Sequence, residues 1–324
     1  MSDETKESLT AEETEALRAE ARRIIEGEGL TARQVADETG IPYGTLTPWL
    51  GGTYKGDNAG KAVLVRRWLE TRTARERLRA VLPAAPAYVE TPTARKILDV
   101  LGYAQTAPDF AVIVGGAGIG KTTAIDAYRR RAANVHVLDA EPCDASPNNM
   151  LTALAGVVGV SETRAVHLSR AIAARLRAAA ALIVVDEAQH LSSAALDQLR
   201  TIHDKAGVGV AVVGNESVYS RLQGQERGAA YAQLYSRVGM RLSQPRARAD
   251  DITALIAAWR IEAEGVARLL RPIAGKPGAL RLMTKVIRLA SMLAAGDGAQ
   301  AIGEAHVRRA WTQLSASPLD GQAA

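Results

Sequence analysis

The sequence predicts an α/β protein in which helices cover both faces of a parallel sheet, with an N-terminal all-α domain and a small C-terminal helical domain. Short apolar runs rich in Val, Ile and Ala occupy residues 110–114, 135–139, 181–189 and 209–213, and segments with a helical pattern separate them. Strands of this kind are typical of a parallel sheet that is buried on both faces. The residues before and after this region show helical periodicity alone.

The first apolar run leads into a glycine-rich loop. Gly115 is followed, after four residues, by Gly120-Lys121-Thr122, which is the G-x-x-x-x-G-K-[ST] spacing of a P-loop. Backbone N–H groups of such a loop surround a polyphosphate, Lys121 can reach its β- and γ-phosphates, and the Thr122 hydroxyl can ligate Mg²⁺. The candidate nucleotide-binding residues are Gly115, Gly116, Ala117, Gly118, Ile119, Gly120, Lys121, Thr122 and Thr123.

The run at 181–189 contains two adjacent carboxylates, which is a Walker B pattern. Asp186 is expected to hold Mg²⁺ through water, and Glu187 to orient and polarise the attacking water. Asn215 follows the next strand and is placed to touch the γ-phosphate or that water. Because ligands bind at the carboxyl ends of parallel strands, we expect these three side chains to lie near Lys121.

Three arginines further along the chain are candidates for nucleotide contact. Arg237 is either a surface charge or a finger that reaches the nucleotide of the next subunit. Arg241 is the alternative finger, on the expectation that residues i and i+4 share a helix face. Arg281, in the first turn of a predicted helix, either points back at the phosphates or is a surface residue.

Residues 30–57 show the pattern of a helix-turn-helix. Thr31 and Gln34 have capping-box spacing, Gly40 lies where a left-handed turn is needed, and Pro42 opens the second helix. A helical hairpin that contacts protein is the alternative. The candidate DNA-binding residues are Tyr43, Thr45, Thr47 and Lys55.

The charge distribution suggests a polyanionic partner. The formal net charge of the 324 residues is +5. Residues 1–20 carry seven acidic and two basic side chains, whereas residues 61–82 carry seven basic and two acidic ones, and residues 241–318 twelve and six. Separate basic segments of this kind indicate nucleic acid or, alternatively, solvated helix faces. An aromatic content of 4% argues against a single-strand binder that stacks bases.

Cysteine content and hydropathy bear on the compartment. The single Cys143 excludes an intrachain disulfide and a Cys-based zinc site. The sequence has no apolar run of about 18 residues, and its polar, acidic N-terminus is unlike a signal peptide. We therefore expect a cytoplasmic protein with no membrane partner.

Composition and periodicity predict the domain boundaries. The Pro- and Ala-rich stretch 83–92 ends an expected linker, and Tyr88–Thr93 is expected to line an adenine pocket. The expected parts are a disordered tail at 1–10, a helix-turn-helix DNA-binding domain at 11–72, a linker at 73–92, an α/β ATPase core at 93–244, a helical lid at 245–316 and a tail at 317–324.

These segments together resemble an AAA+ ATPase. GGAGIGKTT resembles Walker A, LIVVDEAQHL Walker B, VVGN the strand ending in sensor 1, YSRVGMR the arginine-finger box and GKPGALR the sensor-2 helix. DEAQHL, GNE and SRVG are similar to the transposition ATPases within AAA+. A helix-turn-helix followed by WLGGTYKGDNAG and this ATPase resembles the family of the phage Mu transposition protein B, over residues 20–315.

The resemblance implies a function that composition and spacing do not show. It implies ATP and Mg²⁺ as cofactors, an ATP-dependent homo-oligomeric filament on double-stranded DNA with little sequence preference, and capture of target DNA for a DDE transposase whose strand transfer it stimulates. The transposase in turn would stimulate ATP hydrolysis. Two alternatives remain open: a sequence-specific regulator in which nucleotide switches the oligomeric state, and an AAA+ protein of the helicase-loader type.

Overall fold

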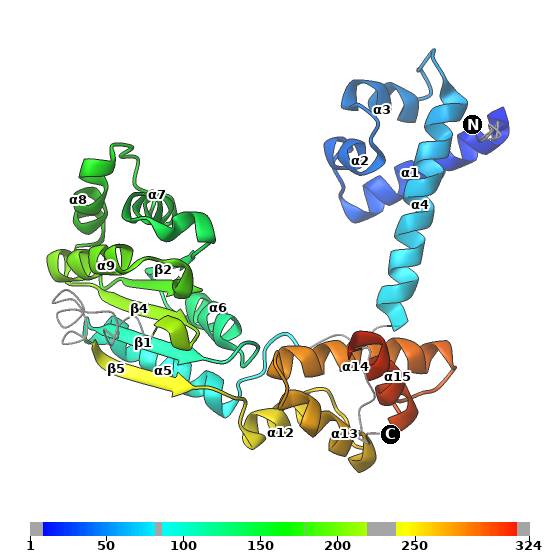
Figure 1. Ribbon diagram of the computed structural model, residues 1–324. Helices are drawn as coiled ribbons and strands as arrows, with labels where there is room; N and C mark the ends of the chain where they lie inside the picture. Colours follow the sequence, from blue (N-terminus) through cyan, green and yellow to red (C-terminus); the bar gives the residue numbers. More distant parts are fainter. Residues whose placement is uncertain (1–8, 82–85, 178, 219–237, 316–324) are drawn as a thin grey trace, which may run out of the picture. The chain divides into compact units, whose positions relative to one another are not determined.

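The chain consists of two units, residues 1–83 and 84–324, which we call the N-terminal unit and the P-loop unit (Figure 1). The computed structural model describes residues 9–81, 86–177, 179–218 and 238–315. The division between the units lies inside the expected linker. However, helix α4 (Asn58–Val81) continues through the start of that linker, so the expected boundary at residue 72 falls within a helix.

Four helices form the N-terminal unit around one apolar core. Trp49 and Leu46 are fully buried at its centre, and Ile41, Val65 and Trp68 pack with them. The other three helices are α1 (Ala11–Glu28), α2 (Ala32–Thr39) and α3 (Tyr43–Leu50).

The helix-turn-helix forms for the reasons that its sequence indicates. The Thr31 hydroxyl accepts the N–H of Gln34 at 3.3 Å, and the Gln34 side chain accepts the N–H of Thr31 at 2.8 Å, which completes a capping box. Gly40 ends α2 with φ of 71°, a left-handed conformation that glycine adopts without a steric penalty. Pro42 then occupies the N-cap of α3.

A five-stranded parallel sheet forms the centre of the P-loop unit, in the order β2-β3-β4-β1-β5. In register, Phe110 of β1 pairs with Val210 of β4, and Leu182 of β3 pairs with Gly209 of β4. The strands are β1 (Phe110–Gly115), β2 (Val135–Asp139), β3 (Leu182–Asp186), β4 (Gly209–Gly214) and β5 (Val238–Gln244). The predicted strands are confirmed, with an end that differs by one residue in β1 and β4 and a shorter β3.

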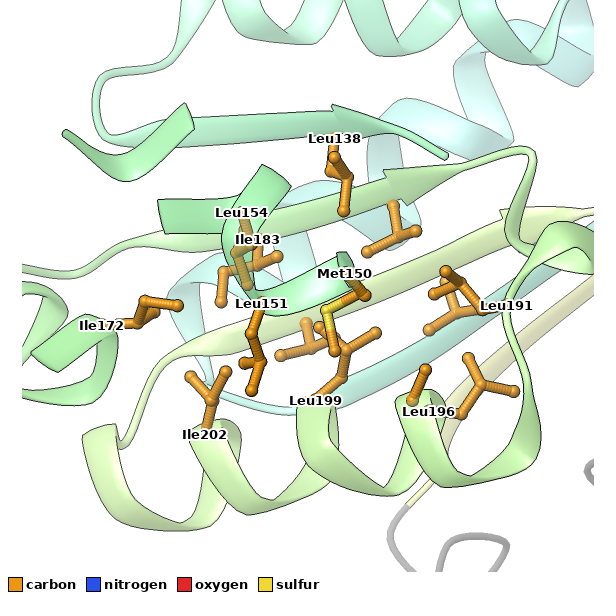
Figure 2. Close-up of a cluster of buried hydrophobic side chains, with 14 of the residues drawn as sticks. Leu138, Met150, Leu151, Leu154, Ile172, Ile183, Leu191, Leu196, Leu199 and Ile202 are labelled. Carbon is orange, nitrogen blue, oxygen red and sulfur yellow. The ribbon is translucent and has the colours of Figure 1, made fainter. Parts of the chain in front are cut away.

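Helices cover both faces of this sheet (Figure 1). Alternate strand residues such as Val112 and Ile183 pack with α7, α8 and α9, and Figure 2 shows part of this cluster. The intervening residues, such as Ile113 and Val184, pack with α5 and α6. The helices are α5 (Pro92–Thr106), α6 (Lys121–Arg131), α7 (Pro147–Val158), α8 (Ala165–Leu176) and α9 (Ser193–Ala206), with 3₁₀ turns at Pro142–Ala145 and Ala188–His190.

Strand β5 is an element that the sequence analysis did not predict. It lies at the edge of the sheet and pairs with β1 alone among the described strands. Its residues alternate between half-buried and exposed, and Gly239, Arg241 and Ser243 occupy exposed positions. The apolar run that marks a central strand is absent here, but Val238, Met240 and Leu242 alternate with less apolar residues, a period-2 strand signal that the sequence analysis missed because it assigned this stretch to a helix face.

The C-terminal helices, which we call the lid, have an apolar core of their own. Leu270, Met283 and Val286 are fully buried in it, together with Val307 and Trp311. The lid consists of α12 (Ala249–Ala258), α13 (Glu264–Ala274), α14 (Ala279–Gly296) and α15 (Glu304–Ser315). Across the described ranges, no helix has both the length and the apolar character needed to cross a membrane.

Candidate functional site

A cavity of about 510 Å³ lies in the P-loop unit where the predicted motifs meet. Its lining combines the P-loop, the ends of β3 and β4, the first residues of the lid helix α14, and the segment before α5. Ten of the predicted site residues line it: Ala117, Gly118, Ile119, Gly120, Lys121, Thr122, Thr123, Glu187, Asn215 and Arg281. Gly115 and Gly116 lie just before this part of the loop, and Asp186 lies behind Thr122.

The P-loop positions the Lys121 ammonium by backbone contacts. Gly120, with φ of 100°, is the N-cap of α6, so Lys121 begins the helix. Its Nζ donates to the carbonyl oxygens of Gly115 at 2.8 Å and Gly116 at 3.0 Å. Burial lowers the pKa of Lys121, while the carboxylates of Asp186 and Glu187 act in the opposite direction. A half-buried cation at a helix N-terminus is suited to bind an anion.

The side chains of Thr122 and Asp186 bring together oxygen atoms that could ligate a metal ion at the base of the cavity. The Thr122 hydroxyl donates to Asp186 Oδ2 at 2.6 Å, and the Glu187 N–H donates to Asp186 Oδ1 at 2.9 Å. Asp186 is 2% exposed, and burial raises the pKa of its carboxyl group, partly offset by these two hydrogen bonds. The first turn of α6, the helix that follows the P-loop, therefore contacts the last residue of β3, and the two motifs predict this contact.

Glu187 has a backbone conformation that is uncommon for its residue type. Its φ is 50°, in the left-handed region, where non-glycine residues occur chiefly at strained or functional positions. Gln189 Nε2 donates to the Glu187 carboxylate, and Gln189 Oε1 accepts the N–H of Asn215 at 3.3 Å. Asn215 Oδ1 also accepts the N–H of Ser217 at 2.9 Å and its hydroxyl at 2.7 Å. Gln189 thus joins the ends of β3 and β4, a role that the sequence analysis missed.

The lid contributes more positive charge to the cavity than the sequence analysis predicted. Arg281 is an exposed residue that lines the cavity, and so do Thr284, Lys285 and Arg288 on the same helix. The spacing i, i+4, i+7 from Arg281 puts both further cations on one helix face. The sequence shows this spacing, but the spacing identifies Lys285 and Arg288 as cavity residues only once α14 is known to face the P-loop.

Backbone contact brings α14 to the P-loop. The N–H of Arg281 donates to the carbonyl oxygen of Gly118 at 3.3 Å. Gly118 has φ of 79°, and a Cβ at this position would collide with the carbonyl oxygen of Gly278, the N-cap of α14. Glycine at 118 is therefore required both by the backbone conformation and by the close approach of the lid.

An apolar wall completes the cavity, formed by Pro86, Val89, Ala94, Leu255 and Leu280. Of the stretch Tyr88–Thr93, which was expected to line an adenine pocket, Tyr88 and Thr91 line the cavity beside this wall, and Thr93 is buried. The Arg131 guanidinium lies 5.4 Å from the centroid of the Tyr88 ring. The buried Tyr88 hydroxyl has no hydrogen-bond partner within the described residues, and burial raises its pKa.

The two finger candidates, Arg237 and Arg241, differ in what the structure says of them. Arg237 lies outside the described residues. Arg241 is exposed on strand β5 and does not line the cavity. The helix-face argument for Arg241 is therefore wrong, because the residue belongs to an edge strand.

The candidate DNA-binding residues lie on the surface of the N-terminal unit. Tyr43 is 55% exposed, Thr47 and Lys55 are exposed, and Thr45 is half-buried. Tyr43, Thr45 and Thr47 belong to α3, and Lys55 to the loop that follows it.

Comparisons with known proteins agree with these features. The family described as "Mu B transposition protein, C terminal" matches residues 236–314, and the family described as "AAA domain" matches residues 104–222. The "ATP-dependent target DNA activator B" of Escherichia phage Mu is 36% identical over 300 residues, which are 92% of this chain and 95% of that protein. The "Mu-like prophage FluMu DNA transposition protein B" of Haemophilus influenzae is 35% identical over 260 residues, 79% and 90% of the two chains.

Solved structures support the fold. Cdc6p from Pyrobaculum aerophilum has a TM-score of 0.56 and 16% identity, covering 72% of this chain and 70% of that chain. The ORC2 protein of Aeropyrum pernix has a TM-score of 0.54 and 17% identity, covering 75% and 73%. With the AAA match, these likenesses confirm the predicted AAA+ parallel-sheet fold. Since the phage Mu relative matches 92% of the chain, the chain belongs to the family of the phage Mu transposition protein B.

Proposed function

We propose that this protein is an ATP-dependent activator of DNA transposition, which binds target DNA and stimulates a transposase. The observation that carries the proposal is that Lys121, Thr122 and Glu187 line one cavity, with Asp186 bonded to Thr122 behind it, in a chain related to a target DNA activator. The finer proposal is that it hydrolyses ATP, forms a homo-oligomeric filament on double-stranded DNA and serves a DDE transposase.

The cavity suits ATP with Mg²⁺. Thr122 and Asp186 are the residues that would hold the ion, because hydroxyl and carboxylate oxygens are ligands that Mg²⁺ prefers. Lys121 and Arg281 supply positive charge for the phosphates. The apolar wall and the unpartnered Tyr88 hydroxyl suit a base or ribose. When bound, Mg²⁺ would neutralise charge on the phosphate oxygens.

The residues of the chain divide the chemistry among them. Lys121 neutralises the phosphate charge that grows in the transition state, and the P-loop amides orient the phosphates. Glu187 orients and polarises the attacking water, and the hydrogen bond from Gln189 fixes the position of the Glu187 carboxylate. Asn215, tied to Gln189 through its backbone, stands beside the same water.

The oligomer would complete the site. We propose Arg237 as a finger that reaches the nucleotide of the neighbouring subunit, with the exposed Arg241 as the alternative. Mixing Arg237→Ala with Lys121→Ala protein tests this, because one subunit supplies an intact P-loop and the other supplies the finger. Partial recovery of ATPase activity supports a shared site, and no recovery despite co-assembly counts against Arg237.

Salt-titrated binding to duplex DNA, with and without ATP, tests the function as a whole. The proposal requires ATP-dependent binding that tolerates many sequences and weakens steeply with salt. Binding to one specific site without ATP would instead indicate a regulator. ATP-dependent binding to a replicative helicase in place of DNA would indicate a helicase loader.

A further inference from the structure

A buried carboxylate joins the lid to the helix behind the apolar wall. Asp251 lies in the first turn of α12, and Thr93 lies in the first turn of α5, 158 positions earlier in the sequence. Both residues are 0% exposed. The contact therefore joins two elements that are distant in sequence, in an interior that water does not reach.

Asp251 satisfies polar groups at the starts of two helices. Its Oδ1 accepts the N–H of Thr93 at 2.8 Å, and its Oδ2 accepts the Thr93 hydroxyl at 2.6 Å and the N–H of Arg248, the N-cap of α12, at 2.9 Å. Amides in the first turn of a helix have no acceptor within the helix. Because the two Thr93 donors are buried, removal of their acceptor would leave them unsatisfied, and this costs more than the loss of an exposed hydrogen bond.

The two joined helices each contribute to the apolar wall. Leu255 lies one turn after Asp251 on α12 and lines the cavity. Ala94 follows Thr93 on α5 and lines it as well. Val89, just before α5, lines the cavity and also packs against the core of the lid. The position of Leu255 relative to Ala94 and Val89 therefore depends on the link between Asp251 and Thr93.

We propose that Asp251 is a positioning residue for nucleotide binding, which acts through Thr93 to hold the lid against the segment before α5 and so forms the wall that receives the base. The inference rests on the proposed binding of ATP and names the part of the chain that shapes the base site. It differs from a plain stabilising role in one respect: the effect falls on ligands that have a base, and not on a bare chain of phosphates.

The test compares ATP with inorganic tripolyphosphate, both with Mg²⁺, by calorimetric titration of the full chain. The variants are Asp251→Asn and Thr93→Val, and Thr93→Ser is the matched control because it keeps the hydroxyl. We expect both variants to weaken ATP binding about tenfold, as for a buried hydrogen bond and its unsatisfied partner, and to change tripolyphosphate binding less than about twofold. Thr93→Ser should bind both ligands as the unaltered chain does.

The outcomes separate this inference from the proposed function. If the unaltered chain binds neither ligand, both fall together. If it binds both, equal weakening of the two ligands in Thr93→Val, or unchanged ATP affinity in a folded Thr93→Val protein, overturns the inference alone. Should Asp251→Asn fail to fold, Thr93→Val still decides, because valine matches threonine in shape and retains the backbone donor. Circular dichroism establishes folding at the temperature of the titration.

Discussion

The two units of the chain use their charged residues in different ways. In the N-terminal unit, arginines are engaged inside the unit: Arg18 lies 5.0 Å from the Trp49 ring centroid and pairs with Glu15. Arg72 pairs with Glu28 and Glu38. The P-loop unit also contains internal ion pairs, such as Arg200 with Asp197 and Asp204, but it has in addition a group of described cations that line one cavity, namely Lys121, Arg281, Lys285 and Arg288.

Charge content follows the same division. Residues 1–83 carry 13 Lys or Arg and 14 Asp or Glu, whereas residues 84–324 carry 27 and 21. The predicted recognition helix α3 has no charged residue. Phosphate contacts supply most of the non-specific affinity for DNA, so we expect the P-loop unit to contribute more of the attraction for polyanions, with residues 61–82 as the basic segment of the N-terminal unit. A helix-turn-helix fold alone does not establish a DNA-binding role.

Glu187→Gln should give the largest effect and confine it to turnover. The substitution keeps the shape and removes the negative charge that polarises water, so ATP hydrolysis should fall by a factor on the order of 10²–10⁴. ATP binding and ATP-dependent DNA binding should persist. Steady-state phosphate release and filter binding measure the two properties, and near-normal turnover would remove Glu187 from this role.

Lys121→Ala should act on binding itself. The ammonium contacts phosphate in the proposed complex, and a charge-assisted hydrogen bond is worth enough that ATP affinity should fall roughly 10- to 100-fold. ATP-dependent DNA binding should fall with it. Lys96→Ala is the matched control, because Lys96 is exposed on α5 and does not line the cavity. ATP affinity that is equal in Lys121→Ala and Lys96→Ala would contradict the P-loop assignment.

In both units, the sequence could predict those features of the candidate sites that depend on local residue patterns. P-loop chemistry requires fixed residue types at fixed spacing, so the sequence alone identifies Lys121, Thr122 and Asp186 as site residues. Their meeting follows from the rule that the carboxyl ends of parallel strands share one edge of a sheet. The capping box at Thr31 and the turn at Gly40 are equally local, and the sequence predicts them too.

What the sequence could not predict depends on contacts between distant segments. Lys285 and Arg288 become site residues only because Gly118 admits α14 beside the P-loop. The link of Asp251 to Thr93 has no local signature, since each residue has the pattern of an ordinary helix start. Strand β5 is a different case, because the alternation of Val238, Met240 and Leu242 with less apolar residues is a local strand signal that was overlooked in favour of a helix.

Removal of charge from Lys285 and Arg288 tests whether the lid contributes to the polyanion site. Each side chain lines the cavity, so Lys285→Ala and Arg288→Ala should each weaken ATP binding about 3- to 10-fold, more at low salt than at high salt. Arg268→Ala is the control, an exposed lid residue outside the cavity. If all three variants bind ATP equally, the positive face of α14 serves another purpose.

Lys55→Ala tests the other side of the comparison and should have the smallest effect. Lys55 is exposed in the loop after α3, and it is the basic residue nearest in sequence to that uncharged helix. If the helix-turn-helix touches DNA, loss of one phosphate contact should weaken binding a few-fold and reduce the salt slope by about one. Tyr43→Ala should weaken binding with an unchanged slope, because tyrosine carries no charge.

Arg23→Ala is the matched control for Lys55→Ala, since it removes one exposed positive charge from α1 in the same unit. ATP affinity should be the same in all three variants, because the altered residues belong to the N-terminal unit and the cavity belongs to the P-loop unit. Equal salt slopes in Lys55→Ala and Arg23→Ala would mean that the unit adds only a diffuse charge. If Tyr43→Ala also leaves DNA affinity unchanged, the exposed face of α3 would be assigned to contact with a protein. DNA binding would then belong to the P-loop unit alone.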